Sequence, residues 1–140
     1  MSAIDWSALE DAAIAARKNA YAPYSKYHVG AAVLADDGRI YAGCNVENAT
    51  YGLTVCAERN AVGAMVTNGA KRIEAVAVVT RGPEIGSPCG MCRQVILELC
   101  EDAPVRLLAV DEGGAIVARK DARAAALLPG HFRGNLVTGA

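Results

Sequence analysis

Apolar residues recur at helical spacing near the start of the chain. Over residues 6–20 they fall three or four positions apart, which predicts one amphipathic helix with a narrow apolar stripe. The stripe consists of Trp6, Leu9, Ala13, Ala16 and Ala20. Further helices are expected over residues 56–68, 89–100 and 121–128.

β-prone runs alternate with these helices. They cover residues 29–34, 40–46, 73–80, 105–110 and 115–118. Asp36-Asp37-Gly38 between the first two runs predicts a hairpin, and the last two runs are joined by so short a turn that they must be antiparallel. The order helix, strand, strand, helix, strand, helix, strand, strand, helix predicts an α/β fold with a mixed sheet covered by helices.

The composition favours one small enzyme domain. The 140 residues fit a single domain, residues 1–140, with a core of its own. The chain is 53% hydrophobic, yet no apolar run approaches the ~20 residues needed to span a membrane. Residues 1–6 lack the pattern of a secretion signal. A net charge of -1 gives no electrostatic reason to bind nucleic acid, so we expect a cytoplasmic protein that acts on a small molecule.

The cysteines carry the candidate chemistry. Five is an odd number, which favours reduced thiols and metal ligation over a disulfide framework. Cys56 lies upstream, and Cys89 and Cys92 form a P-C-x-x-C motif at the predicted start of a helix. Three thiolates hold Zn²⁺ and leave its fourth position open, as in catalytic sites. The sequence therefore predicts one Zn²⁺ per chain, bound by Cys56, Cys89 and Cys92.

Two charged residues follow Cys56. The Glu58 carboxylate is placed to shuttle protons at the ion, as in the general pattern of zinc-dependent nucleobase deaminases. Three thiolates on a dication leave a net charge of -1, which weakens zinc as a Lewis acid. Arg59 is the candidate that offsets this charge by donating to a thiolate sulfur. The alternative is an arginine that pairs only with solvent.

Other interpretations of these residues stay open. A buried cysteine is often a small hydrophobic residue, and redox motifs and structural zinc sites also contain C-x-x-C. Cys44 and Cys100 are expected to be packing residues. His28 or His131 would turn the site structural if either supplied a fourth ligand, although ordinary polar roles are expected for both.

Several separated motifs resemble the small homotetrameric, zinc-dependent cytidine deaminases of the cytidine/deoxycytidylate deaminase superfamily. They are AYAPYSK at 20–26, GCNVENA at 43–49, CAER at 56–59, PCGMCRQ at 88–94 and LLPG at 127–130. The resemblance implies a three-layer α/β/α sandwich around a five-stranded mixed sheet. It also implies a homotetramer and hydrolysis of cytidine or 2′-deoxycytidine to uridine or 2′-deoxyuridine and ammonia in pyrimidine salvage.

The resemblance also implies substrate contacts. Asn45 and Glu47 match a pair that hydrogen-bonds the ribose 3′-hydroxyl, and Tyr27 stands where the family often has a phenylalanine that packs on the pyrimidine. The backbone of Ala57 is expected to contact the base. Ala49, Tyr51 and Phe132 match positions that serve a neighbouring subunit's site. The sequence departs from the commonest family pattern at Met91 and at Asn60, where threonine is usual.

The expected mechanism uses water activated by zinc, with Glu58 as proton shuttle to N3 of the base and then to the departing ammonia. Three rival functions remain. One is a deaminase of another aminopyrimidine nucleoside, such as a blasticidin-type antibiotic. The second is a nucleic-acid-editing deaminase, which the absence of a basic stripe disfavours. The third is a non-catalytic zinc-binding module, which has no need of Glu58.

Overall fold

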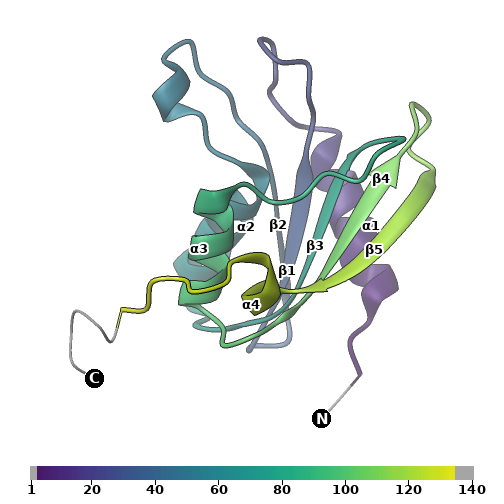
Figure 1. Cartoon of the computed structure of the whole chain (residues 1–140). Coiled ribbons are helices and arrows are strands. Elements are labelled where there is room, and N and C mark those ends of the chain that lie inside the picture. The colour runs from purple at the N-terminus through teal and green to yellow at the C-terminus, as the bar shows by residue number, and fades with distance from the viewer. Residues whose placement is uncertain (1–2, 135–140) are drawn as a thin grey trace.

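Five strands form one mixed sheet in the computed structural model, which describes residues 3–134 (Figure 1). The strands are β1 (Gly30–Ala35), β2 (Ile40–Cys44), β3 (Ile73–Arg81), β4 (Pro104–Val110) and β5 (Ile116–Arg123). Their spatial order is β2-β1-β3-β4-β5, and β3 pairs with β4 in parallel. The other neighbours are antiparallel. The predicted mixed five-stranded sheet is confirmed.

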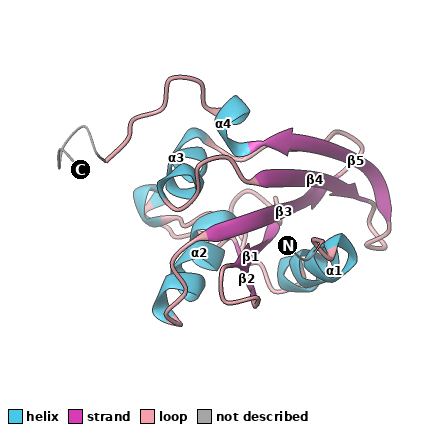
Figure 2. Cartoon of the chain, turned by 90° about the horizontal axis from the view of Figure 1, so that it is seen from below, coloured by secondary structure: helices cyan, strands magenta, loops and turns pink. Residues whose placement is uncertain are grey.

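Helices cover both faces of this sheet. They are α1 (Trp6–Arg17), α2 (Ala57–Thr67), α3 (Gly90–Glu98) and α4 (Ala124–Leu127), with a 3₁₀ turn, η1 (Tyr51–Leu53). Seen along the sheet, α1 lies on one side and α2 and α3 lie on the other (Figure 2). This is the three-layer arrangement that the sequence resemblance implied. No helix among residues 3–134 has the length and apolar character needed to cross a membrane.

The strands alternate between two apolar cores. On β3, Val76 and Val78 face the core beneath α2 and α3, whereas Ala77 and Val79 face the core beneath α1. This two-sided burial explains why residues 73–80 form a nearly continuous apolar run rather than an alternating one. Small residues on the α1 side let that helix pack closely on the sheet.

The last elements differ from their predicted bounds. The final strand was expected over residues 115–118 and the final helix over 121–128, but β5 extends to Arg123 and α4 is a single short turn. Backbone pairing with β4 continues to Arg123, opposite Pro104, and an ion pair joins Arg106 to Asp121 at 2.8 Å. The strand predicted from the sequence was too short because the last residues of this exposed edge strand are charged and show no periodic apolar pattern.

Candidate functional site

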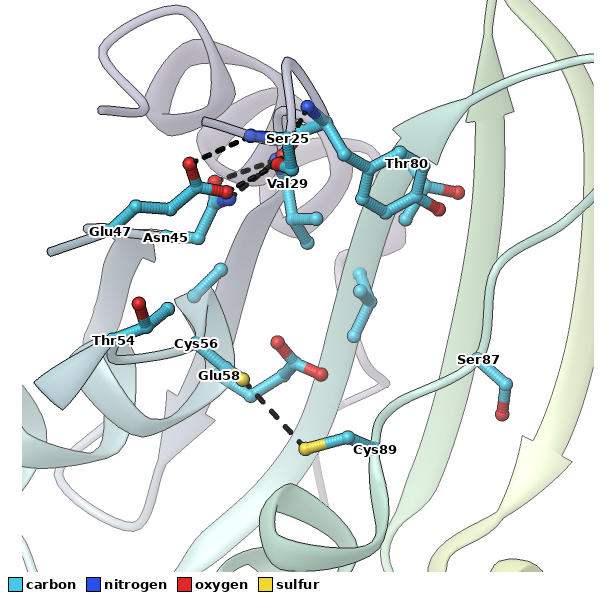
Figure 3. A pocket seen from close by; sticks show the side chains of 13 residues that line it. Ser25, Val29, Asn45, Glu47, Thr54, Cys56, Glu58, Thr80, Ser87 and Cys89 are labelled. Carbon is cyan, nitrogen blue, oxygen red and sulfur yellow. Dashed lines mark hydrogen bonds between the residues drawn. The ribbon is translucent and has the colours of Figure 1, made fainter. Parts of the chain in front are cut away.

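One end of the sheet gathers every element that carries the predicted chemistry. β2 ends there, β1 begins there, β3 ends there, and α2 and α3 both start there. A cavity of about 210 Å³ opens at this end (Figure 3). Its lining residues are Ser25, Tyr27, Val29, Asn45, Glu47, Thr54, Cys56, Ala57, Glu58, Val78, Thr80, Ser87 and Cys89.

Two of the three predicted metal ligands occupy the N-cap positions of helices, but their side chains make no capping hydrogen bond. Cys56 and Cys89 are the N-cap residues of α2 and α3, both have extended backbone, and neither side chain hydrogen-bonds the helix. Their sulfurs are therefore not engaged by the helix amides, and they lie 3.7 Å apart. Cys92 is three residues after Cys89 on α3, so it returns to the same side of the helix. The three Sγ atoms all lie within 4.8 Å of one another.

This sulfur geometry fits a zinc ion. Zn–S bonds of about 2.3 Å in a tetrahedron place neighbouring sulfurs about 3.8 Å apart. The Cys56–Cys89 separation is close to this value, and Cys92 lies within reach of the same ion. Among the described residues, the potential ligands that gather here are these three cysteines, and neither His28 nor His131 joins them. Three protein ligands leave a position for a reacting molecule.

The site concentrates negative charge on one sulfur. Hydrogen bonding from the Cys92 thiol and from the Arg59 guanidinium lowers the pKa of Cys56 to about 5, against the effect of burial. The same hydrogen bond, together with burial, raises the pKa of Cys92. All three sulfurs ionise together only if a cation balances them.

Arg59 lies against this charge. Its Nη2 donates to Cys56 Sγ at 3.5 Å and to the carbonyl of Thr54 at 3.5 Å. Proximity to the Cys56 sulfur raises the pKa of the guanidinium. Arg59 Nε is buried and has no hydrogen-bond partner within the described part of the chain. The guanidinium therefore lies against the sulfur of a predicted metal ligand, and its role in offsetting the thiolate charge stays a prediction.

Glu58 is a buried carboxylate beside the sulfurs. It is the second residue of α2, and 4% of it is exposed. Its side chain extends into the cavity on the same side as Cys89 (Figure 3). Burial raises the pKa of this carboxyl, and the nearby Cys56 sulfur raises it further. A carboxyl with its pKa raised in this way is suited both to accept and to release a proton.

Close packing fixes the start of α2 against β2. A side chain at Gly43 would place its Cβ 2.5 Å from the amide nitrogen of Ala61 and 2.7 Å from the carbonyl of Ala57, so only glycine allows this approach. Asn60 Nδ2 donates to the carbonyl of Cys44 at 2.8 Å. The helix that carries Glu58 is thus held to the strand that leads into Asn45. Asn60, an unusual residue for the resembled family, performs this contact.

Asn45 joins two chain segments at the cavity wall. Its Oδ1 accepts from the Val29 amide at 2.9 Å, and its Nδ2 donates to the Tyr27 carbonyl at 2.8 Å. One amide proton and one lone pair remain free for a substrate hydroxyl. Asn45 therefore has a structural role in addition to the binding role that the resemblance implies.

Glu47 organises the loop that carries Tyr27. Its carboxylate accepts from the backbone amides of Tyr24 at 3.0 Å and Ser25 at 3.1 Å, and from the Ser25 hydroxyl. The Ser25 hydroxyl bond, followed by these amides, lowers the pKa of Glu47 and keeps it ionised. An anionic acceptor thus lies at the cavity edge opposite the sulfurs (Figure 3).

Three predicted substrate residues lie outside this chain's own cavity. Ala49 is exposed, Tyr51 is 76% exposed, and Phe132 is 57% exposed. The Tyr51 ring meets Tyr24 edge-on at 6.0 Å, and the Phe132 carbonyl accepts from Gln94. Their side chains are available at the surface rather than to the Glu58 carboxylate of the same chain.

Arg93 supports the site, although no role was predicted for it. Its Nε donates to the Pro88 carbonyl at 2.8 Å, its Nη2 to the Ser87 hydroxyl at 2.8 Å and its Nη1 to the Leu127 carbonyl at 2.5 Å. It thereby ties the residues just before Cys89 to the start of the LLPG motif. Only its place beside the P-C-x-x-C motif hinted at this in the sequence.

Comparisons with known proteins agree with this geometry. The model of the cytidine and deoxycytidylate deaminase zinc-binding region matches residues 5–107. A cytidine deaminase of Sporosarcina psychrophila is 51% identical over 120 residues, which span 84% of this chain and 83% of that protein. One from Mycobacterium tuberculosis is 49% identical over 111 residues, 76% of this chain and 84% of that protein. The crystal structure of cytidine deaminase from Burkholderia pseudomallei matches with a TM-score of 0.81 at 42% identity, covering 92% of this chain and 100% of that one.

Proposed function

The chain belongs to the zinc-binding cytidine and deoxycytidylate deaminase family, and we propose that it hydrolyses cytidine and 2′-deoxycytidine to uridine and 2′-deoxyuridine with release of ammonia. This reaction serves pyrimidine salvage. The observation that carries the proposal is a cavity in which Cys56 and Cys89, two of the three convergent thiols, and the buried carboxyl of Glu58 lie across from Asn45 and Glu47.

Cys56, Cys89 and Cys92 are the residues that hold zinc in this proposal. Zinc bound there supplies an acidified water as nucleophile at neutral pH. Glu58 takes a proton from the attacking water and delivers it to N3 of the pyrimidine, which makes C4 electrophilic. Glu58 then takes the proton of the hydroxyl formed at C4 and delivers it to the amino group, which leaves as ammonia while C4 becomes a carbonyl. Its raised pKa suits repeated proton transfer better than that of an exposed carboxylate would.

Substrate binding is assigned to the opposite side of the cavity. The free donor and acceptor of Asn45 and the anionic Glu47 together complement a ribose hydroxyl that both donates and accepts. Tyr27 offers an aromatic face for the base. The Ala57 backbone at the start of α2 contributes a contact to the pyrimidine.

We further propose a homotetramer with composite sites, working in the cytoplasm. The exposure of Tyr51 and Phe132, outside their own chain's cavity, supports a role in a neighbouring copy. Closed symmetry would repeat such contacts at every site. The five cysteines are all free, and unpaired thiols are typical of the reducing conditions of the cytoplasm.

The decisive experiment follows the loss of ultraviolet absorbance when purified protein is mixed with cytidine or 2′-deoxycytidine. Both nucleosides should be consumed, with one ammonia released for each uracil nucleoside formed. Cytosine, cytidine monophosphate and adenosine serve as controls. A protein that carries zinc and yet deaminates neither nucleoside would refute the proposed activity, and consumption of only another aminopyrimidine nucleoside would redirect it.

A further inference from the structure

Thr80 is a buried polar residue in the wall of the cavity. It is the second-to-last residue of β3, and 4% of it is exposed. Its neighbour Val79 faces the core under α1, so Thr80 points to the opposite side of the sheet, into the cavity. A hydroxyl so well buried is found where it makes a specific hydrogen bond.

The partner of Thr80 lies in the segment that leads to Cys89. Thr80 Oγ1 accepts from the backbone amide of Gly86 at 3.1 Å. This segment leaves the sheet at Gly82, whose amide donates to the Val110 carbonyl at 2.7 Å. It reaches α3 at Cys89. The Thr80 hydroxyl therefore holds the segment to the sheet about midway between its two ends.

Gly86 is also the point at which Tyr27 meets this segment. A Cβ on Gly86 would lie 2.7 Å from Tyr27 Oη and 2.8 Å from Thr80 Oγ1, closer than real side chains come. The hydroxyl groups of Tyr27 and Thr80 thus both pack against Gly86, on the side where a side chain would project. Tyr27 belongs to the loop that Glu47 and Asn45 organise. The contact at Gly86 consequently sets the distance between the substrate-binding side and the metal-binding side of the cavity.

A second anchor acts on the same segment from α3. Arg93 holds the Pro88 carbonyl and the Ser87 hydroxyl, one and two residues before Cys89. Cys89 is the most exposed of the three predicted metal ligands. An exposed ligand on a connecting segment keeps its place only if that segment is fixed on both sides, here by Thr80 and by Arg93.

We propose that Thr80 is a positioning residue for the deamination reaction: its hydroxyl fixes Gly86 and thereby aligns Cys89 and the Tyr27 wall around the substrate. The inference rests on the proposed function for its kinetic consequence. The alignment itself is a property of the protein alone and has its own readout.

The test compares Thr80→Val with Thr80→Ser. Valine keeps the shape and removes the acceptor, whereas serine keeps the hydroxyl and removes the methyl group. For Thr80→Val we expect kcat/KM for cytidine to fall about 10-fold, the low end for residues that support a metal ligand. The change should appear in both kcat and KM, because the segment borders both the metal-binding and the substrate-binding sides. Thr80→Ser should stay close to the parent.

Amide hydrogen exchange at Gly86 supplies the readout that does not depend on activity. Exchange should be faster in Thr80→Val than in the parent and in Thr80→Ser, while amides in β4 are unchanged. Parent-like exchange and kinetics in Thr80→Val would overturn the proposal, as would an equal loss in Thr80→Ser. If the parent itself proves inactive on cytidine, the proposed function fails, and the exchange comparison still decides the positioning role.

A second variant covers the case in which Thr80→Val does not accumulate as folded protein. Gly86→Ala places a methyl group against Tyr27 Oη and the Thr80 side chain and so displaces the segment. We expect a loss of kcat/KM of at least the same size as in Thr80→Val. Unchanged kinetics in Gly86→Ala would show that the position of this segment does not matter.

Discussion

Replacing Glu58 with glutamine should separate catalysis from folding and metal binding. The substitution keeps the shape of a side chain that is 4% exposed, and it removes the proton-transfer group. General acid–base groups contribute about 10²–10⁴-fold to rate. Glu58 is assigned more than one transfer in each turnover, so we expect a loss of kcat near 10⁴-fold, equivalent to about 5 kcal/mol of activation free energy.

The same variant should not lose stability. Burial raises the pKa of Glu58 above the 4.5 of an unperturbed carboxyl, so the folded chain binds this proton more tightly than the unfolded chain does. Stability contributed by this group is present at acidic pH and is lost as pH rises from about 4.5 through the folded-state pKa. At pH 7 the neutral glutamine avoids the free-energy cost of ionising a buried carboxyl. The melting temperature of Glu58→Gln should equal or exceed that of the parent.

Three measurements on one preparation check these statements: deamination of cytidine at saturating substrate, zinc content, and thermal unfolding at pH 7. Glu74→Gln makes the same chemical change at an exposed position on β3 and should leave all three unchanged. If Glu58→Gln retained activity within about a factor of ten of the parent, Glu58 would not be the proton shuttle. A folded variant that lacked zinc would instead show that Glu58 supports the metal.

Three further changes probe the charges and the surface. Arg59→Gln should lower kcat by about 10–100-fold and shift the pH–rate profile, because the extra thiolate charge is no longer balanced; an unchanged profile and turnover would contradict this. Arg119 and Arg106 hold the pKa of Glu10 below its usual value, so its stabilisation is present above about pH 4.5 and is lost as pH falls through the folded-state pKa. Glu10→Gln should therefore unfold more easily at pH 7, by about 2 kcal/mol in denaturant titrations, with the difference shrinking toward pH 3. Phe132→Ala should raise KM without changing zinc content, and light scattering that finds a fully active single chain would refute the composite-site tetramer.

The metal site was predictable because its signals are local. Cys89 and Cys92 are three residues apart at a helix start, and Cys56 and Glu58 open another helix, so short patterns define the ligand set. The edge-strand residues Lys120 to Arg123 carry no comparable signal. Their strand conformation depends on pairing with β4 and on the Arg106–Asp121 ion pair, which join positions far apart in sequence.

The support of the site was not predictable for the same reason. Thr80 lies at the end of an apolar run and looks like an ordinary strand residue until the sheet register places it beside Gly86. The same register brings Val29 next to Asn45, whose side chain then clamps a loop that precedes β1. Roles of this kind depend on contacts that exist only in the folded chain, so neither the spacing nor the type of these residues indicates them in the sequence.

The two N-cap cysteines deprive their helices of a stabilising side-chain cap. Helices usually begin with Ser, Thr, Asp or Asn, whose side chains satisfy an otherwise unpaired amide and contribute about 1 kcal/mol. Cys56 and Cys89 occupy these positions with no side-chain cap, so α2 and α3 both begin without that stabilisation. Their sulfurs instead project from two converging helix starts and lie 3.7 Å apart. A cation held by both sulfurs would join the two helices and would fix their first turns in place of the missing caps.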